Sequence, residues 1–563
     1  MPKQTAPYDV IVVGSGASGG WAAKRLAEAG INVALVEAGR AHNPGETYEH
    51  TRPHELPYAN LSRELLRKTR PKQTDCYACT EHNAHWFVND HDEPYTTPAD
   101  RPFSWQGRTR MVGGRTNVWG RQSYRFSQQD LKGHSFDGAG ADWPLGYNDL
   151  VPYYDLVERY VGISGQAENV PELPDSQFLP PMAMSCSEKM LSAAAKKSFG
   201  RTITIGRAAI LTQNHNDRAA CHYCGPCERG CMTRSYFNAA FTTVADAVAT
   251  GKCTLITNAM VNQVMMDPDH RRATGVRYVD RVTRQTREIR GRSVVLCAQA
   301  LESVRILLNS TTAQQPEGLA NSSGTLGRYL MDHLWVAGGA RGDFPDLEAT
   351  PTLGGPRRPN GIYVIRFRNT ANGPRESRFL RGFGFQGGGS TNFTAAAQGF
   401  GNAYKEAIRE GMTSLNLSGF GECLPQESNF IEIDPEAVDV FGIPALRISM
   451  AWGENEKAMI SDMAETAAEM LDAAGAKNIQ PFMNRDRVPG YGIHEMGGAR
   501  MGADRKTSVL NQFQQAHDVA NLFVMDAASF PSGACQNPTL TIMAMAARST
   551  DYLMTELKRG AIG

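Results

Sequence analysis

The chain has 563 residues, more than one domain usually contains, so two domains are expected. Hydrophobic residues make up 41% and charged residues 21%, and 58 basic side chains balance 58 acidic ones, so no net charge favours binding to nucleic acid. No apolar run is long enough to span a bilayer, and residues 1–7 lack the apolar core of a signal peptide.

The first predicted elements form a strand–turn–helix–strand unit. An apolar, β-branched run over 8–13 leads directly into a glycine-rich turn over 14–19. A helical pattern over 22–29 and a second apolar run over 33–36 follow, and an acidic residue closes the second run. This order, with the G-x-G-x-x-G turn between strand and helix, is typical of dinucleotide-binding proteins.

Each glycine of this turn has a separate role in a dinucleotide site. Gly14 allows the tight turn, Gly16 lets a pyrophosphate approach the backbone, and Gly19 lets the helix pack against the strand. Glu37 is placed to accept a hydrogen bond from a ribose hydroxyl. The motif predicts a dinucleotide without distinguishing NAD from FAD, and a glycine turn in an unrelated α/β unit is the alternative.

The segment after this unit contains a dense group of cysteine and histidine. Residues 40–75 are polar and interrupted by proline, so we interpret them as irregular. Cys76, Cys79, His82 and His85 follow at a density that could hold zinc. Their repeated three-residue spacing is unlike that of the usual zinc fingers, which favours ordinary packing or an inert thiol pair.

A glycine pair lies in the loop over 107–126. Gly113 and Gly114 precede Asn117, and paired glycines suit a backbone that passes close to a planar ring or a phosphate. A plain loop between strands is the alternative. A helix is expected to begin after the Asp-Trp-Pro run at 142–144 and to end near Val161.

Four cysteines, Cys221, Cys224, Cys227 and Cys231, fall within eleven residues. Their C-x2-C-x2-C-x3-C spacing is that of the bacterial ferredoxin run, except that Met232 replaces the proline that often follows. The spacing predicts an iron–sulfur cluster held by one loop, either a [4Fe-4S] cluster on four cysteines or a [3Fe-4S] cluster on three. Zinc, disulfides and free thiols are the alternatives.

The rest of the chain alternates between strand and helix patterns. Short alternating runs between 335 and 450 predict an antiparallel sheet, and a stripe of methionines in the helix over 455–474 indicates core packing. Strands are expected over 253–256, 261–265, 275–279, 293–297 and 521–526, and helices over 300–308, 455–474 and 539–557.

The C-terminal quarter carries the motifs of a known family. His494 begins an H-E-M-G-G run, and Asn537 lies 43 residues later in a C-Q-N-P-T run. With the glycine-rich turn, a G-x-x-L-x-D-H run ending at His333 and the strand ending at Asp526, these motifs resemble the glucose–methanol–choline (GMC) oxidoreductases over nearly the whole chain. Gly498 is a departure, because the family usually has Thr or Ser there.

The resemblance implies FAD rather than NAD, and an α/β fold: a Rossmann-like βαβ FAD-binding domain plus an α+β substrate domain with a mostly antiparallel sheet. The FAD-binding domain would comprise 1–135, 205–335 and 486–563, with the cysteine loop 221–231, and the substrate domain 136–204 and 336–485. By resemblance, the FAD contacts are Gly14, Gly16 and Gly19 (pyrophosphate), Glu37 (adenosine ribose), Gly113, Gly114 and Asn117 (flavin) and Asp526 (pyrophosphate or ribityl chain).

His494 and Asn537 match the family's active-site pair. An alcohol gives a hydride to flavin only if its hydroxyl also loses a proton, and a histidine with a pKa of about 6.5 suits that role at neutral pH. Asn537 would donate a hydrogen bond to the substrate oxygen. Without the resemblance, a core histidine and a helix-capping asparagine would explain both residues.

Within the family, Cys221, Cys227 and Cys231 have the spacing of the cluster ligands in FAD-dependent sugar dehydrogenase catalytic subunits, and Cys224 is extra. The chain most resembles glucoside 3-dehydrogenases. We therefore expect oxidation of a sugar or glycoside hydroxyl, favoured at C3 of a glucoside, with electrons leaving through the cluster to a cytochrome c-type acceptor. A polyol, glucose or gluconate dehydrogenase or oxidase, and a non-catalytic flavin electron-transfer subunit, are the alternatives.

The resemblance also implies a partner and a location. Enzymes of this branch work with a small subunit that carries the export signal, so a periplasmic location by co-export is expected, with the cytoplasm as the alternative. The region 335–450 would line the substrate pocket, where Asn360, Arg366 and Gln386 are polar candidates.

Overall fold

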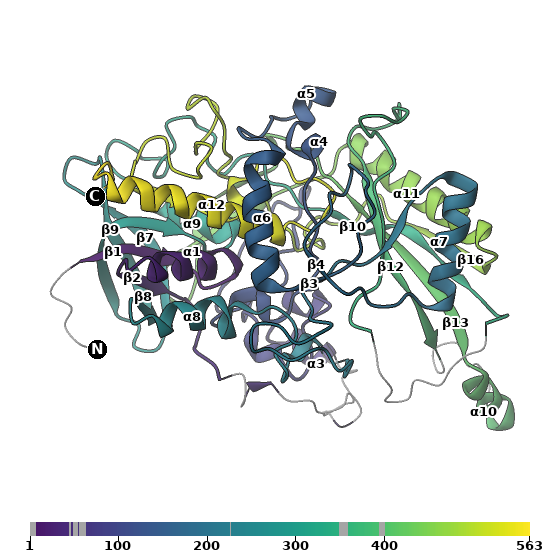
Figure 1. Ribbon diagram of the computed structural model, residues 1–563. Coiled ribbons are helices and arrows are strands. Elements are labelled where there is room, and N and C mark those ends of the chain that lie inside the picture. The colour runs from purple at the N-terminus through teal and green to yellow at the C-terminus, as the bar shows by residue number, and fades with distance from the viewer. Residues whose placement is uncertain are drawn as a thin grey trace.

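The computed structural model describes residues 7–43, 47–48, 55, 63–225, 227–347, 358–392 and 400–562. Two large sheets lie at opposite ends of the molecule, and helix α6 (Tyr147–Val161) stands between them (Figure 1). This arrangement confirms the expected mixed α/β fold, whereas the domain boundaries stay a prediction. Residues 1–6, part of the segment without signal-peptide character, lie outside the described residues.

The first sheet has seven strands in the order β6-β2-β1-β9-β8-β7, with β17 paired to β9. Pairing is parallel from β6 to β9 and also between β17 and β9, and it becomes antiparallel from β9 to β7. The parallel strands are nearly continuous apolar runs because helices cover the sheet. All the strands expected here are present: β1 (Tyr8–Val13), β2 (Val33–Val36), β6 (Cys253–Ile256), β7 (Ala259–Met266), β8 (Ala273–Asp280), β9 (Thr286–Leu296) and β17 (Leu522–Val524).

Helix α1 begins five residues earlier than its pattern predicts. It spans Ala17–Glu28, directly after Gly16, whose extended backbone forms the N-cap. A Cβ on Gly19 would lie 1.8 Å from the carbonyl oxygen of Gly14, so close packing outweighs the low helix propensity of glycine. Helix α1 packs against α8 (Thr243–Ala249) and α12 (Thr539–Lys558), while α9 (Ala300–Asn309) contacts β7.

The second sheet has six strands in the order β16-β10-β13-β12-β11-β5, and every pairing is antiparallel, as expected for this region. Helix α11 (Glu454–Ala473) covers it, and the buried Met459, Met463 and Met470 confirm the packing role of the methionine stripe. The strands are β5 (Ile203–Ile205), β10 (Leu334–Asp343), β11 (Ile362–Val364), β12 (Phe383–Asn392), β13 (Met412–Gly421) and β16 (Lys477–Met483).

Several smaller elements complete the described chain, and none of its helices combines the length and apolar character of a membrane span. Helix α3 lies inside the segment that we interpreted as irregular. The smaller elements are α3 (Arg63–Arg67), α4 (Gln128–Leu131), α5 (Gly133–Asp137), α7 (Cys186–Phe199), α10 (Gly401–Glu410), β3 (Ile163–Ser164), β4 (Phe178–Leu179), β14 (Phe430–Val438) and β15 (Pro444–Ser449).

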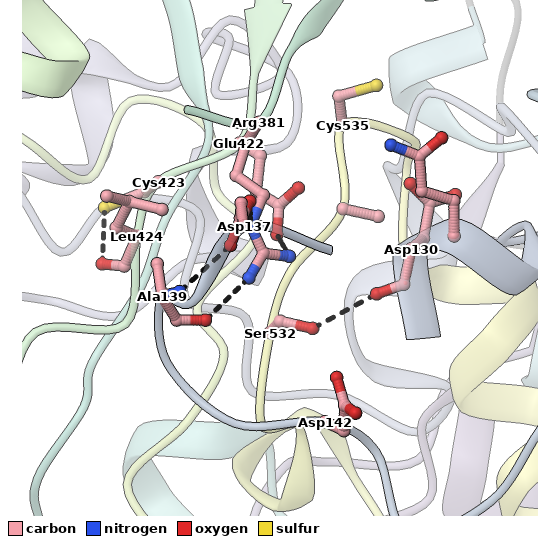
Figure 2. Close-up of polar contacts among 12 residues, drawn as sticks. Asp130, Asp137, Ala139, Asp142, Arg381, Glu422, Cys423, Leu424, Ser532 and Cys535 are labelled. Atoms are coloured by element: carbon pink, nitrogen blue, oxygen red, sulfur yellow. Dashed lines mark hydrogen bonds and ion pairs between the residues drawn. The ribbon is translucent and has the colours of Figure 1, made fainter. Parts of the chain in front are cut away.

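A buried group of charges joins the second sheet to α5. Arg381 lies between Asp137 (2.7 Å) and Glu422 (3.2 Å) and donates to the Ala139 carbonyl oxygen (Figure 2). All three charged side chains are at most 3% exposed, and burial raises the pKa of the Glu422 carboxyl. The guanidinium is therefore the charge that makes two buried carboxylates tolerable.

Replacing Arg381 with methionine is expected to destabilise the protein by about 3–5 kcal/mol, because two buried carboxylates would lose their common partner. Urea denaturation of the two forms measures the difference. Arg447→Met is the matched control: Arg447 is 48% exposed beside the exposed Glu432, so its loss should cost at most about 1 kcal/mol. Equal shifts in the two variants would contradict the argument.

Candidate active site

One cavity of about 700 Å³ joins the motifs from both ends of the chain. Gly14, Gly16 and Glu37 line one end, and His494 and Asn537 line the other. Its volume lies in the upper part of the range of about 300–1,000 Å³ that ligand sites usually occupy. The folded chain therefore brings the glycine-rich turn and the C-terminal pair into a single site.

The glycine-rich turn forms a cradle at the start of α1. Gly14 has φ +99°, and a Cβ there would lie 2.3 Å from the carbonyl oxygen of Cys297. A Cβ on Gly16 would meet no protein atom within 4 Å, so that position faces open space in the cavity. The first turn of α1 carries no acidic side chain, which leaves its backbone N–H groups suited to an anion.

Glu37 connects the cradle to the end of β2. Its Oε2 accepts hydrogen bonds from the Ser15 backbone (3.0 Å) and hydroxyl (2.6 Å), and its Oε1 accepts from the Gly39 N–H (2.7 Å). The Glu37 side chain is 7% exposed, and Oε1, which accepts one hydrogen bond, keeps a lone pair for a further donor. The Ser15 hydroxyl also accepts a hydrogen bond from the Gly113 N–H, at 3.0 Å.

The second glycine pair packs against the cradle. Gly114 lines the cavity, and a Cβ on it would lie 3.4 Å from the Cα of Gly16. Gly113 and Asn117 lie behind this surface. Asn117 is fully buried, donates to the Val112 and Gly114 carbonyl oxygens, and accepts from the Tyr48 hydroxyl at 2.5 Å. Asn117 therefore fixes the loop, while the backbone around Gly114 faces the ligand space.

Asp526 lines the middle of the cavity just after β17. Its carboxylate accepts from the Ser303 hydroxyl at 2.5 Å and from the Ala528 N–H at 2.9 Å. Burial raises the pKa of this carboxyl to about 6. Three features together fit FAD along this side of the cavity: the open space at Gly16, the free helix N-terminus, and the carboxylates of Glu37 and Asp526, which can accept hydrogen bonds from hydroxyl groups.

At the other end of the cavity, His494 lies between His333 and Asn537. The Nδ1 atoms of the two histidines are 2.7 Å apart, and the Nε2 of His494 lies 3.4 Å from the Nδ2 of Asn537. Gln386 Nε2 donates to Asn537 Oδ1 at 2.5 Å, and His333 Nε2 lies 2.9 Å from the carbonyl oxygen of Ala534.

These contacts define the tautomers of both histidines. The Ala534 oxygen can only accept, so His333 carries its proton on Nε2 and offers a lone pair at Nδ1. His494 must then donate from Nδ1, which leaves the lone pair of its Nε2 facing Asn537 and the cavity. The hydrogen bonds thus run in one direction from Gln386 to Ala534, and the lone pair of His494 Nε2 is occupied only by the long contact with Asn537, at 3.4 Å.

Burial keeps both imidazoles neutral. It lowers the pKa of His333 to about 4. Burial also lowers the pKa of His494 well below 6.5, and the neighbouring His333 and the positive charge of Arg115 lower it further. Arg115 pairs at 2.6 Å with Glu495, which is buried next to His494. A neutral His494 is the form that accepts a proton.

The acid limb of kcat/KM is therefore expected below pH 6.5, because activity requires neutral His494, whose pKa is lowered. Arg115→Met removes a positive charge and leaves Glu495 unpaired, so the pKa of His494 rises. The acid limb of the pH–rate profile should therefore shift to higher pH by about 0.5–1 unit. The pH–rate profile measures this. Arg505→Met, which removes an equal charge at an exposed site, should leave the limb in place.

Asp332 holds the backbone of the His494 loop. Its two carboxylate oxygens accept from the Gly492 N–H at 2.8 Å and the His494 N–H at 2.9 Å. A Cβ on Gly492 would lie 2.4 Å from the Asp332 carboxylate, so this contact requires glycine at that position. Burial, with a smaller effect of Glu495, raises the pKa of Asp332 to about 7.

Two unlike walls flank the histidine end of the cavity. Aromatic rings form one wall: Tyr77 and Trp335 have ring centroids 5.8 Å apart, and Phe420 lies 5.7 Å from both Trp335 and His494. Another part of the lining is polar and comprises Arg121, Gln122, Arg358, Asn360 and Gln386. Asn360 Oδ1 and Arg121 Nε are buried without a hydrogen-bond partner in the described structure.

Sequence reasoning placed some of these residues and missed others. Asn360 and Gln386 line the cavity as expected, but Arg366 does not, because it is buried in an ion pair with Asp130 at 3.1 Å. Gly498, at φ +94°, faces Val304. The contributions of His333, Arg115 and Glu495 were missed. His333 and Glu495 had a signal, because they lie in the G-x-x-L-x-D-H and H-E-M-G-G runs, whereas Arg115 had none.

The four-cysteine loop lies beside the cavity wall. Cys221 and Cys231 pack against a hydrophobic cluster that includes Tyr236, whose hydroxyl donates to the Asn117 carbonyl oxygen at 2.6 Å. Burial raises the pKa of the Cys227 thiol to about 11, and Arg121 opposes that rise. In the described part of the chain, no three Cys, His, Asp or Glu side chains are arranged to hold a metal ion.

The earlier Cys and His group is also accounted for by packing. Cys76 and Cys79 are buried in a small hydrophobic cluster with Trp86, and burial raises the pKa of their thiols to about 11 and about 12. His85 is exposed and lies with its ring centroid 6.0 Å from that of Trp86. Among the residues that the structure describes, this segment forms no metal-binding group.

Comparison with known proteins agrees with this geometry. The family models of the N- and C-terminal parts of the GMC oxidoreductases match residues 8–335 and 425–546. The chain is 30% identical to 2-methyl-1,2-propanediol dehydrogenase of Mycolicibacterium austroafricanum (98% of this chain, 96% of that protein), and 25% identical to the fructose dehydrogenase large subunit of Gluconobacter japonicus, over the full length of both chains.

Pyridoxine 4-oxidase of "Mesorbium loti" has the same fold, with a TM-score of 0.63 at 18% identity, over 97% of this chain and 99% of that one. The expected FAD-dependent enzyme of alcohol or sugar oxidation is thereby confirmed. From the cradle, the histidine pair and these matches over nearly the whole chain, it follows that the chain belongs to the GMC oxidoreductase family.

Proposed function

We propose that this protein is an FAD-dependent dehydrogenase that oxidises a hydroxyl of a sugar or glycoside to a carbonyl, with C3 of a glucoside as the favoured position. The observation that carries the proposal is the pairing of His494 Nε2 with Asn537 in the cavity that begins at the glycine cradle. Gly14, Gly16, Gly19, Glu37 and Asp526 would hold the cofactor.

FAD, when bound, supplies the acceptor for the hydride of the alcohol carbon. The chain supplies the proton chemistry: His494 Nε2 takes the hydroxyl proton, and the hydrogen bond to His333 fixes the orientation of its ring. The Asn537 amide, oriented by Gln386, donates to the substrate oxygen. Together these contacts select which carbon faces the cofactor.

The two walls of the cavity support a sugar as the substrate. A sugar ring has C–H faces that pack on aromatic rings such as Trp335 and Phe420, and hydroxyls that require donors and acceptors. Asn360 Oδ1 and Arg121 Nε are unpartnered groups of this kind beside the polar wall. A small diol would leave these groups without partners.

Anaerobic addition of a substrate panel tests the proposal. Methyl glucoside, glucose, gluconate, choline and 2-methyl-1,2-propanediol are each mixed with the oxidised holoenzyme, and bleaching of the flavin absorbance is followed. Bleaching is expected to be fastest with the glucoside, and NMR of the product should show a carbonyl at C3. Bleaching only by choline or the diol would exclude a sugar dehydrogenase, and no bleaching by any compound would indicate a non-catalytic subunit.

We further propose that the loop 221–231 holds an iron–sulfur cluster that supplies the electron exit to a cytochrome c-type acceptor. The support is the ferredoxin-like spacing and the position of the loop, because Cys231 packs against the hydrophobic cluster that contains Tyr236, and Tyr236 donates to the Asn117 carbonyl oxygen. A small partner subunit carrying an export signal would place the enzyme in the periplasm.

The purified protein is expected to contain about three to four iron atoms per chain with matching acid-labile sulfide. Cys227→Ser should lower the iron content and slow electron transfer to cytochrome c while the flavin remains bound. Cys186→Ser is the control, because Cys186 is exposed and lies outside the run. Iron-free protein that still passes electrons to cytochrome c would reject the cluster.

A further inference from the structure

We propose that a second pocket, of about 280 Å³, binds a phosphate-class anion behind the Glu37 end of the main cavity. The two spaces share Arg110 as a wall, and Arg281 reaches from the pocket to the Ala38 carbonyl oxygen at 3.2 Å. The lining is dominated by polar side chains: Arg40, Arg70, His85, Asn89, Asp92, Glu93, Arg110, Asn258 and Arg281.

Two of the four arginines are already neutralised. Arg110 bridges Glu93 (2.7 Å) and Glu302 (2.5 Å), and Arg281 pairs with the other oxygen of Glu93 at 2.8 Å. Glu93 is 2% exposed, so this ion-pair group is a fixed part of the pocket wall. Arg281 still has a buried Nε that no group in the described structure accepts.

The other two arginines carry charge that the pocket does not fully balance. In the described part of the chain, neither Arg40 nor Arg70 has a carboxylate within ion-pair distance, and Arg70 donates only to the Phe87 carbonyl oxygen and a threonine hydroxyl. Burial and, next, the positive charge of Arg40 lower the pKa of His85, which indicates a positive potential here.

The charge and the chemistry of the lining select the ligand. Four guanidiniums meet three carboxylates, those of Asp92, Glu93 and the Glu302 that pairs with Arg110, so one net positive charge remains. An anion balances this charge, and the identity of the anion follows from the donor geometry. Guanidinium groups bind phosphate oxygens through paired N–H donors, and the free Nε of Arg281 adds a further donor. The lining therefore fits a phosphate group, free or on a small ester.

Calorimetric titration of the holoenzyme at constant ionic strength tests this, with inorganic phosphate in one arm and glucose 6-phosphate in the other. One saturable site is expected, and competition between the two ligands should assign both to it. Arg40→Gln and Arg70→Gln should each weaken binding by at least about tenfold. Tighter binding of the ester would identify an organic phosphate as the occupant, and tighter binding of phosphate would identify the free ion.

Arg284→Gln is the matched control, because it removes an equal charge from an arginine that packs on Phe441 outside the pocket lining. Its binding constant should change by less than about twofold. Two results would overturn the proposal: no saturable binding of either ligand, or a loss in Arg284→Gln as large as in the pocket variants. Arg40 is exposed, so its variant should fold even if the Arg70 variant does not.

Discussion

His494→Ala should lower the rate of flavin reduction by about 10²–10⁴-fold, because the variant lacks the only nitrogen that the hydrogen-bond chain presents to the substrate as a base. The flavin content should stay unchanged, since the glycine cradle lies at the other end of the cavity. Stopped-flow reduction with the best substrate of the panel, together with the flavin-to-protein absorbance ratio, measures both quantities.

His134→Ala is the control for this experiment. His134 is exposed on α5, so its replacement should change neither the reduction rate nor the flavin content. Reduction of the His494 variant at the rate of the unmodified enzyme would show that another group takes the proton. Loss of flavin from the variant would instead show that the two ends of the cavity depend on each other.

Gly16→Ala and Gly14→Ala should fail in different ways. The new Cβ at position 16 meets no protein atom within 4 Å, so the fold should be retained while the methyl group occupies space that the pyrophosphate needs. FAD affinity is expected to fall by at least about tenfold. At position 14 the φ of +99° and the 2.3 Å approach to Cys297 oppose any side chain, so the fold itself should be destabilised.

Flavin absorbance per chain and the thermal midpoint of the apoprotein separate these two effects. Gly30→Ala is the matched control: Gly30 also has a positive φ, +82°, but a Cβ there has no neighbour within 4 Å and lies outside the cavity lining. Only the strain of the left-handed backbone, roughly 1–2 kcal/mol, is expected there. If Gly16→Ala retained FAD at full affinity, the cradle would not be the pyrophosphate site.

The sequence predicted the strands and the long amphipathic helices, because continuous apolar runs and 3.6-residue periodicity are local signals. Helix α7 was missed although Ser185 and Glu188 form a capping box, with the Ser185 N–H donating to Glu188 at 2.7 Å. The start of α1 was missed for a different reason. Its glycines are poor helix formers, and only tertiary packing against Gly14 places them in the helix.

For the site, the sequence predicted residue types but not their geometry. Gly14, Gly16, His494 and Asn537 were predicted because motifs name them, and all four line one cavity, while their roles stay a prediction. The side of the loop on which Asn117 lies could not be predicted, since its burial depends on Tyr48, a residue 69 positions earlier in the chain. The role of an asparagine depends on which partners the tertiary structure provides.

The hydrogen-bond chain at His494 depends on the second sheet, with Gln386 on β12 and His333 directly before β10. The glycine cradle, by contrast, is built at the end of β1 in the first sheet. A molecule in which the second sheet has moved away can therefore keep its bound flavin and still be inactive. For this enzyme, flavin absorbance therefore measures the fraction of molecules that hold the cofactor. Turnover per bound flavin measures the fraction in which both sheets are correctly placed.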